Sequence, residues 1–169
     1  PNFSEGRDLS LIEQITDSME SIGGITLLDV DPGADTNRTV VTIVGDPESV
    51  IQSAFLGIKK ASELIDMRKH KGAHARMGAT DVCPFVPISE TNMDDCVEYS
   101  KQLAQQVGKE LKIPVYLYEF SATAKNKVNL AVVRSGEFEG MNEKMKSTKW
   151  KPDYGPAKPH KTAGVTAIG

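Results

Sequence analysis

This sequence has little cysteine and no long apolar run. Its two cysteines, Cys83 and Cys96, both stand inside apolar patterns. So few cysteines exclude a disulfide-stapled secreted scaffold and favour a reducing compartment. No apolar run approaches the roughly 20 residues that cross a bilayer, and no signal peptide opens the chain. We therefore expect a soluble protein of the cytoplasm with no membrane partner.

The sequence also lacks an excess of positive charge. Its 20 lysines and arginines are outnumbered by 23 aspartates and glutamates, which gives a formal net charge of −3. A dedicated nucleic-acid surface usually makes a domain basic overall, so this balance argues against nucleic acid as a partner. The length of 169 residues suits one domain that buries a core without a structural metal.

Apolar periodicity predicts three amphipathic helices. They cover residues 9–22, 47–65 and about 94–111. The second begins with Asp46 as its cap and Pro47 at its first helical position, where a missing N–H costs nothing. From about Lys125 onward the pattern weakens, and it predicts a short helix followed by a long loop.

Extended segments rich in β-branched residues predict strands between these helices. They read ITLLDVD, TVVTIVG, DVCPFVPI, IPVYLYEF and, at the end of the chain, AGVTAIG. Pro84 and Pro87 make the third an edge or bulged strand, because proline cannot donate to a ladder. In the fourth, alternating aliphatic and tyrosine residues indicate two different faces. The opening Pro-Asn pair favours a turn over a strand.

The elements follow in the order helix, strand, strand, helix, strand, helix, strand. This order predicts an α/β (α+β) two-layer sandwich, in which helices pack on one face of a mixed sheet and leave the other face free. We also expect a further strand before Pro1. The abrupt ends indicate a piece of a longer protein.

A basic segment broken by glycines, RKHKGAHARMGATD, runs from Arg68 to Asp81. His74 is its strongest candidate for chemistry, because imidazole exchanges protons near neutral pH. A solvated loop without chemistry explains the same pattern equally well. His70 and His74 would share a face on a helix and bind a metal there, but Gly72 and the small number of ligands argue against a metal site.

Other chemistry-bearing residues leave alternatives open. The cations of the basic segment suit carboxylates as well as phosphates, and the sequence contains neither glycine-rich nucleotide-binding motif. Asp29 and Asp31 are two apart on a predicted strand and so point to one face, although acids are also ordinary residues at strand ends. Cys83 is a candidate nucleophile, but a small buried hydrophobe is the favoured interpretation.

Four motifs, PNFSEG, LLDVDPGADTNRTVVTIVG, HKGAHARMGATDVCPFVPI and KPDYGP, together resemble the glutamate formimidoyltransferase family, specifically its amino-terminal subdomain, over residues 1–169. The resemblance implies a transferase of histidine breakdown and one-carbon metabolism. Such an enzyme moves the formimino group of N-formimino-L-glutamate to tetrahydrofolate and yields L-glutamate and 5-formiminotetrahydrofolate. It also implies a channel between two facing sheets, whose second wall is a carboxy-terminal subdomain absent from this chain.

The resemblance further implies a set of site residues. His74 matches the catalytic histidine, and Asp31 would supply negative charge or orient the imidazole. Substrate carboxylates would be bound by Arg68, Lys71 and Arg76, with Asn2 of the first motif. Tetrahydrofolate would contact Gly155, Pro156, Lys158, His160, Lys161, Thr162 and Gly164. No metal is expected.

One departure from the family pattern keeps a second function open. Ala73 and Ala75 stand where the family usually has Glu and Pro beside the histidine. A module that binds folate or another anionic metabolite without turnover is therefore an alternative, since fold does not fix function. A small nucleic-acid binder that uses the basic segment is a further alternative, and its binding would fall steeply with salt.

Overall fold

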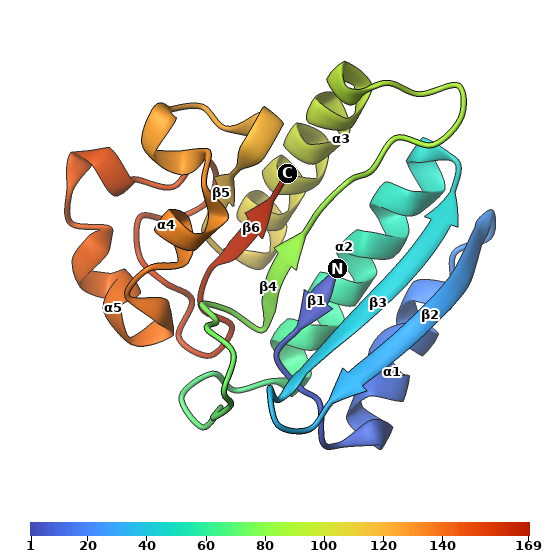
Figure 1. Cartoon of the computed structure of the whole chain (residues 1–169), viewed down its shortest axis with the longest axis horizontal. Helices are drawn as coiled ribbons and strands as arrows, with labels where there is room; N and C mark the ends of the chain where they lie inside the picture. The colour runs from blue at the N-terminus through green and yellow to red at the C-terminus, as the bar shows by residue number, and fades with distance from the viewer.

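A six-stranded sheet runs through the molecule (Figure 1), and the computed structural model describes residues 1–169. Its strands are β1 (Asn2–Phe3), β2 (Ile25–Gly33), β3 (Arg38–Gly45), β4 (Thr80–Cys83), β5 (Val115–Leu117) and β6 (Thr166–Ile168). Their order across the sheet is β2-β3-β1-β4-β6-β5. The first four are joined by antiparallel pairings, and β4, β6 and β5 are parallel. The predicted mixed sheet is confirmed.

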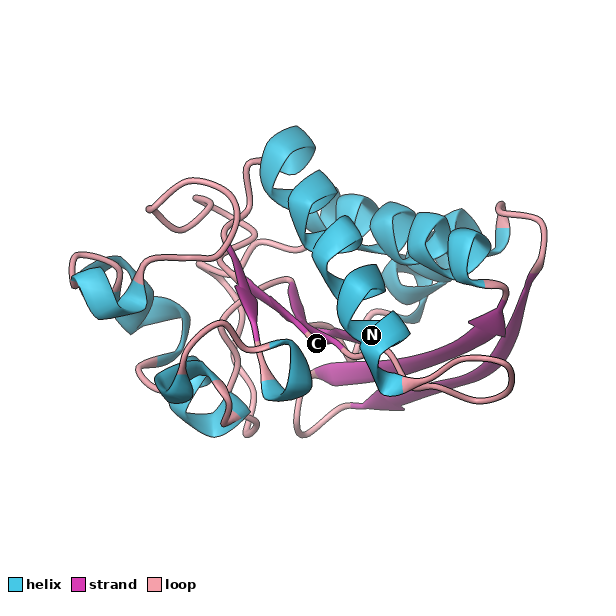
Figure 2. Cartoon of the chain, turned by 90° about the horizontal axis from the view of Figure 1, so that it is seen from above, coloured by secondary structure: helices cyan, strands magenta, loops and turns pink.

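Three long helices lie together on one side of this sheet, as Figure 2 shows. They are α1 (Leu9–Glu20), α2 (Pro47–Leu64) and α3 (Met93–Gln106), and the π-helical turn η1 (Val107–Leu111) continues α3. Asp46 caps α2 by accepting the Ser49 N–H at 3.0 Å, with Pro47 at the first position as predicted. None of the helices combines the length and the apolar character that a membrane crossing needs.

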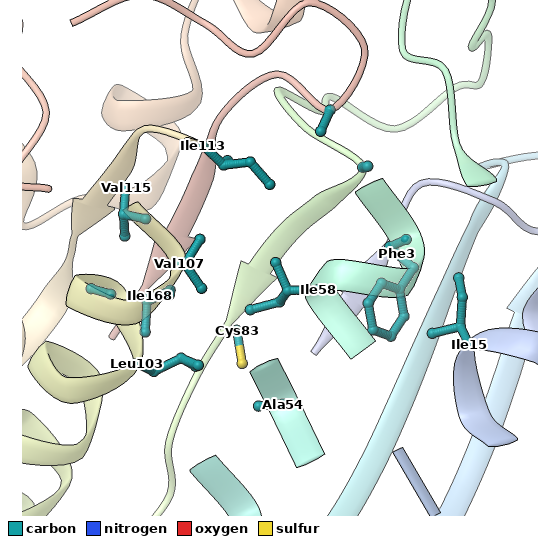
Figure 3. Packing of buried hydrophobic residues seen from close by; sticks show 14 of the residues in the cluster. Phe3, Ile15, Ala54, Ile58, Cys83, Leu103, Val107, Ile113, Val115 and Ile168 are labelled. Carbon is teal, nitrogen blue, oxygen red and sulfur yellow. The ribbon is translucent and has the colours of Figure 1, made fainter. Parts of the chain in front are cut away.

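The main core fills the space between these helices and the sheet. Figure 3 shows Phe3 of β1, Ile58 of α2 and Cys83 of β4 among its side chains. Each of the three is at most 2% exposed. Burying one aliphatic or aromatic side chain contributes about 1.5–3 kcal/mol, so this layer fixes the positions of the strands that carry the open face.

A second, smaller core lies on the opposite face, over β4, β6 and β5 only. It joins Val82, Tyr116 and Ala167 of these strands to Val133 and Met141. The latter two belong to α4 (Leu130–Arg134) and α5 (Glu137–Lys144). The strand predicted to have two different faces is confirmed, because Tyr116 belongs to this core while its neighbours Val115 and Leu117 belong to the main one. The free face of the sheet is its β2–β3–β1 half.

Two local predictions need correction. The opening Pro-Asn pair does not turn: Asn2 and Phe3 form β1 in the middle of the sheet, because Phe3 is anchored in the main core. The strand with two prolines is central, not an edge, because β4 ends at Cys83 before the first of them. Its predicted bulge is present, as a register shift against Asn2 and Phe3.

The weak pattern after Lys125 holds more structure than a single helix. Besides α4 and α5, the short 3-10 turns η3 (Lys125–Lys127) and η4 (Thr148–Trp150) occur in this region, and η2 (Glu119–Ser121) precedes it. Side chains join these short elements to one another. Lys127 Nζ donates to Asp153 at 2.8 Å, and Lys144 Nζ donates to carbonyls at the end of α4. Such contacts between distant residues leave no periodic signal in the sequence.

Candidate active site

On the face opposite the long helices, a line of residues runs from the open half of the sheet to β4. Strand register pairs Asp31 with Val40, Val40 with Asn2, and Asn2 with Val82. Asp29 pairs with Thr42 on the same face, and both aspartates are exposed. The prediction that they share a face is confirmed. Neither aspartate makes a hydrogen bond or an ion pair within the chain, so both carboxylates are free to meet a ligand.

An apolar groove of about 480 Å³ opens between β3 and the segment that follows β4, and it reaches α2 and α3 behind the sheet. Its walls include Asn2 and Val40 on the sheet and the segment that follows β4. Val86 and Ile88 of that segment are 74% and 73% exposed, and Leu28 of β2 is 59% exposed. An exposed apolar patch of this kind marks a surface that meets a ligand or another protein surface.

The basic segment forms a loop beside the hairpin turn that joins β2 and β3. The Asn37 side chain donates to the Lys71 carbonyl at 2.8 Å, and the Ala73 N–H donates to the Asp35 carbonyl at 3.1 Å. Gly72 passes so near the turn that an added Cβ would lie 2.3 Å from the Thr36 carbonyl oxygen. The loop is therefore fixed against the end of the sheet.

His70 is the buried anchor of this loop, and 7% of it is exposed. Its Nδ1 accepts from Arg76 Nε at 3.1 Å, so the ring proton is on Nε2, which donates to the Asn37 carbonyl at 2.8 Å. Burial lowers the pKa of His70, against the opposing effect of the bond to Asn37. Because both ring nitrogens are bonded within the chain, a metal site shared by His70 and His74 finds no support.

His74 is placed differently at the outer part of the loop, where it is half-buried. Its Nδ1 lies 2.6 Å from the Ala75 carbonyl oxygen. A carbonyl oxygen only accepts, so Nδ1 carries the proton and the Nε2 lone pair is free. No other residue of the chain hydrogen-bonds to this ring, Asp31 included. His74 thus offers a proton acceptor to whatever lies beside the loop.

The three predicted cations have different surroundings. Arg76 is buried and pairs with Glu137 at 3.2 Å and Glu139 at 2.7 Å. The hydrogen bond from Arg76 lowers the pKa of Glu139 to about 2. Arg68 pairs with Asp66 at 2.7 Å and is half exposed, and Lys71 is exposed without a carboxylate partner. Their substrate-binding roles stay predictions, and Arg76 has the geometry of a loop anchor.

The predicted folate segment divides into two parts. His160, Thr162 and Gly164 lie beside the His74 loop, since the Met67 N–H donates to the Thr162 carbonyl and Gly164 pairs with Gly78. Nδ1 of His160 accepts the Ala163 N–H at 3.0 Å, and burial lowers the pKa of this imidazole. Gly164 has φ +68°, and a Cβ there would lie 2.3 Å from the Met77 carbonyl oxygen.

The other members of that predicted set lie earlier in the same segment, apart from Lys161, which stands between His160 and Thr162. Gly155 packs against Gly108, which follows α3, and a Cβ on it would lie 2.7 Å from the Ile113 carbonyl oxygen. Pro156, Lys158 and Lys161 are exposed and make no side-chain hydrogen bond. The structure thus brings His160, Thr162 and Gly164 to the His74 loop and leaves Gly155 at the far end of the segment.

Sequence reasoning missed a buried pair of arginines. Arg38 Nη1 and Arg134 Nη2 lie 2.6 Å and 2.7 Å from the same oxygen, Oδ2 of Asp81. The Asp81 side chain is fully buried, and its other oxygen accepts the Met77 N–H at 2.8 Å. Arg38 also donates through Nε to the Asn2 side chain at 3.1 Å. No local pattern signals this group, because it joins β3, β4 and α4.

The two cysteines are placed as packing residues beside the groove. Cys83 and Cys96 are free thiols and both are buried. Burial raises the pKa of each thiol, which disfavours the reactive thiolate. The interpretation of Cys83 as a small buried hydrophobe is confirmed. No three His, Cys, Asp or Glu side chains gather in a way that would hold a metal ion.

Comparison with known proteins gives long matches. A glutamate formimidoyltransferase from Streptococcus pyogenes serotype M1 is 54% identical over 169 residues, which are 100% of this chain and 56% of that protein. A formimidoyltransferase-cyclodeaminase from Dictyostelium discoideum is 48% identical over 100% of this chain and 32% of its own length. One from Rattus norvegicus is 47% identical over 100% of this chain and 31% of its own length.

The chain therefore spans little more than half of the first relative and about a third of the other two. The family model described as "Formiminotransferase domain, N-terminal subdomain" matches residues 1–169. Both comparisons cover every part of the candidate site, from Asn2 on β1 to Gly164 beside the His74 loop. Together with the mixed sheet and its open half, they establish that this chain belongs to the family of formiminotransferase amino-terminal subdomains.

Proposed function

We propose that this chain forms one wall of a cytoplasmic active site that transfers the formimino group of N-formimino-L-glutamate to tetrahydrofolate. The products are L-glutamate and 5-formiminotetrahydrofolate. The second wall is a carboxy-terminal formiminotransferase subdomain that faces the open half of the sheet. The observation that carries the proposal is the His74 ring, which is held by its own loop through Nδ1 and leaves Nε2 free.

His74 is the general base and then the general acid of the transfer. A tetrahydrofolate nitrogen attacks the amidine carbon, and the Nε2 lone pair of His74 accepts the proton that this nitrogen loses. In the tetrahedral intermediate the new carbon–nitrogen bond is complete. The imidazolium then returns its proton to the glutamate nitrogen as the old carbon–nitrogen bond breaks. One group thus serves both steps, and no proton is gained or lost overall.

Asp31 supports this reaction through its charge. The electrophile is a protonated amidine, so a nearby carboxylate stabilises it better than an oxyanion hole would. Asp31 makes no hydrogen bond to His74, and this favours stabilisation of the amidinium over orientation of the imidazole. Its place on the open face, in register with Val40 and one strand from Asn2, is consistent with contact to a ligand bound there.

The cations of the loop serve the carboxylates of the two substrates. Lys71 is exposed and has no carboxylate partner, so it is free to pair with the glutamate tail of tetrahydrofolate. Arg68 would have to give up its ion pair with Asp66 in order to bind a substrate carboxylate. We assign Arg76 to holding the loop, because its buried guanidinium is engaged by His70, Glu137 and Glu139. Thr162 and the exposed Lys158 and Lys161 are proposed folate contacts.

The test is formation of 5-formiminotetrahydrofolate by the chain combined with a carboxy-terminal subdomain. We expect His74→Ala to lower turnover by about 100- to 10,000-fold, the range of general acid–base catalysis, with unchanged affinity for tetrahydrofolate. Lys69→Ala, an exposed change in the same loop, is the matched control and should keep full activity. Wild-type protein that binds folate without turnover would reject the transferase and favour the binding module that Ala73 and Ala75 suggest.

A further inference from the structure

The arginine pair carries more positive charge than its surroundings neutralise. Arg38 and Arg134 share one carboxylate oxygen of Asp81, so two buried guanidinium groups face a single negative charge. Their side chains are 9% and 13% exposed. Burying two like charges beside each other is unfavourable unless further acceptors complete the site. The group therefore retains one unit of positive charge for an anion.

The same pair also has hydrogen-bond donors without acceptors. Nε of Arg134 is buried and has no partner. Nη2 of Arg38 and Nη1 of Arg134 make no hydrogen bond within the chain and are not among the buried unpaired atoms. Buried polar groups are nearly always satisfied, and one left without a partner calls for an explanation such as a bound ion. Both arginines thus keep unpaired donors for a further acceptor.

The pair is attached to rigid elements at the border of the open face. Arg38 belongs to β3 and reaches toward Asn2, which lies in the line of open-face residues. Arg134 ends α4, where Lys144 Nζ donates to the Val132 and Val133 carbonyls, both at 2.7 Å. A cation held on packed elements loses little freedom on binding, unlike exposed Lys71.

The pair is also connected to the loop of His74. Asp81 accepts the Met77 N–H through the oxygen that the arginines do not share. Glu137, which follows Arg134 closely in sequence, accepts the Arg76 N–H at 3.2 Å. The arginines and the loop that carries His74 are thus fixed to the same group of atoms. A ligand that contacts both would be held at a defined distance between its anionic end and its reacting carbon.

We propose that Arg38 and Arg134 bind a carboxylate of the glutamate skeleton at the edge of the open face. One unit of excess charge matches a monoanionic carboxylate better than a dianionic phosphate, and the planar guanidinium fork matches the two carboxylate oxygens. That the carboxylate belongs to glutamate rests on the proposed function. The existence of the anion site does not, since it depends only on the charges and donors of this chain.

Binding is tested on the chain itself by titrating it with glutarate and with L-glutamate and following the arginine Nε–H signals by NMR. We expect the Arg134 signal to shift in a saturable manner, with sodium chloride at equal ionic strength as the control. Arg134→Gln should weaken binding by about tenfold, the loss of one charged hydrogen bond. Arg134→Lys keeps a positive charge beside Asp81, so the fold should be preserved, but it loses the planar guanidinium fork. Weaker binding by this variant is therefore not explained by unfolding.

The outcomes are separable. Lys59→Gln, an exposed change on α2, should leave binding unaltered. No saturable shift, equal affinity in wild type and Arg134→Lys, or tighter binding of inorganic phosphate than of glutarate would overturn the carboxylate site. If glutarate binds through Arg134 but the combined protein makes no 5-formiminotetrahydrofolate, the anion site stands and the proposed transferase fails. If turnover is normal and the KM for formiminoglutamate is unchanged in Arg134→Lys, the proposed transferase stands and the anion site fails as a substrate site.

Discussion

His70 and His74 lie four residues apart in one loop and are bonded in opposite ways. His70 is buried, and both of its ring nitrogens have partners, Arg76 on one side and the Asn37 carbonyl on the other. His74 is half-buried and has one partner, the carbonyl of its neighbour Ala75. The same side chain thus fixes the backbone at one position and is left available for proton transfer at the next.

The difference shows how a polar loop is held in a fixed conformation. A segment with so many lysines, arginines and glycines has little apolar surface to bury, so its order comes from hydrogen bonds to fixed partners. His70 and Arg76 supply these bonds from inside the loop, and Asn37 supplies them from the hairpin turn. A residue between these anchors, such as His74, is then held in place without being enclosed.

The largest test of this comparison is His70→Ala. We expect it to lower the free energy of unfolding by on the order of 3 kcal/mol, because a buried arginine donor and a backbone carbonyl lose their partners together. Denaturation by urea, followed by circular dichroism, measures the change. His70→Gln keeps a donor and an acceptor and should recover most of the loss.

The matched control is His74→Ala, which should leave the unfolding midpoint in place while it removes turnover. A comparable loss of stability in both variants would contradict the division of roles, and so would full turnover in His74→Ala. Because the two positions share one loop, expression and purification affect both variants alike. The contrast between them is therefore more informative than either value.

The sequence predicted the elements better than it predicted the site. Apolar periodicity located all three long helices, the cap at Asp46 located the start of one of them, and the tyrosine alternation indicated that β5 has two different faces. These signals are local. Asn2 and Phe3 gave no such signal, because two residues are too few for a pattern and only burial of Phe3 in the core identifies them as a strand.

Site geometry was accessible only in part for the same reason. His74 could be singled out from its own chemistry and from a motif, and the alternation of a strand placed Asp29 and Asp31 on one face. The arginine pair could not be found in this way, since Arg38, Asp81 and Arg134 meet only when β3, β4 and α4 have packed. From the sequence, Arg76 cannot be distinguished from an arginine that binds a ligand. Only its contacts indicate that it anchors the loop.

A smaller effect is expected from Gly72→Ala, which lies between the two histidines. The added methyl group would come within 2.3 Å of the Thr36 carbonyl oxygen, a backbone atom, so the loop must move away from the hairpin. We expect a stability loss of about 1–3 kcal/mol, as for other overpacked sites, and lower turnover at temperatures where the variant is folded. Lys71→Ala, next in sequence and exposed, is the control for stability. Unchanged stability in Gly72→Ala would show that the loop is not fixed against the hairpin.

The smallest effect concerns pH, and it comes from the imidazoles of His70 and His160. Burial lowers the pKa of His70 and of His160 below the usual 6.5. As the pH falls through 6.5, the unfolded chain binds protons that the folded chain does not, so the free energy of unfolding decreases from pH 7 toward pH 5. Asp66 and Glu139, with pKa values of about 2, begin to lose their stabilising effect only at lower pH. The double variant His70→Gln and His160→Asn should flatten this decrease. Each new side chain is neutral at all pH values and can keep the hydrogen bonds that its histidine accepts. Urea denaturation at several pH values measures how the free energy of unfolding changes. An unchanged slope in the double variant would mean that neither imidazole is held neutral by burial.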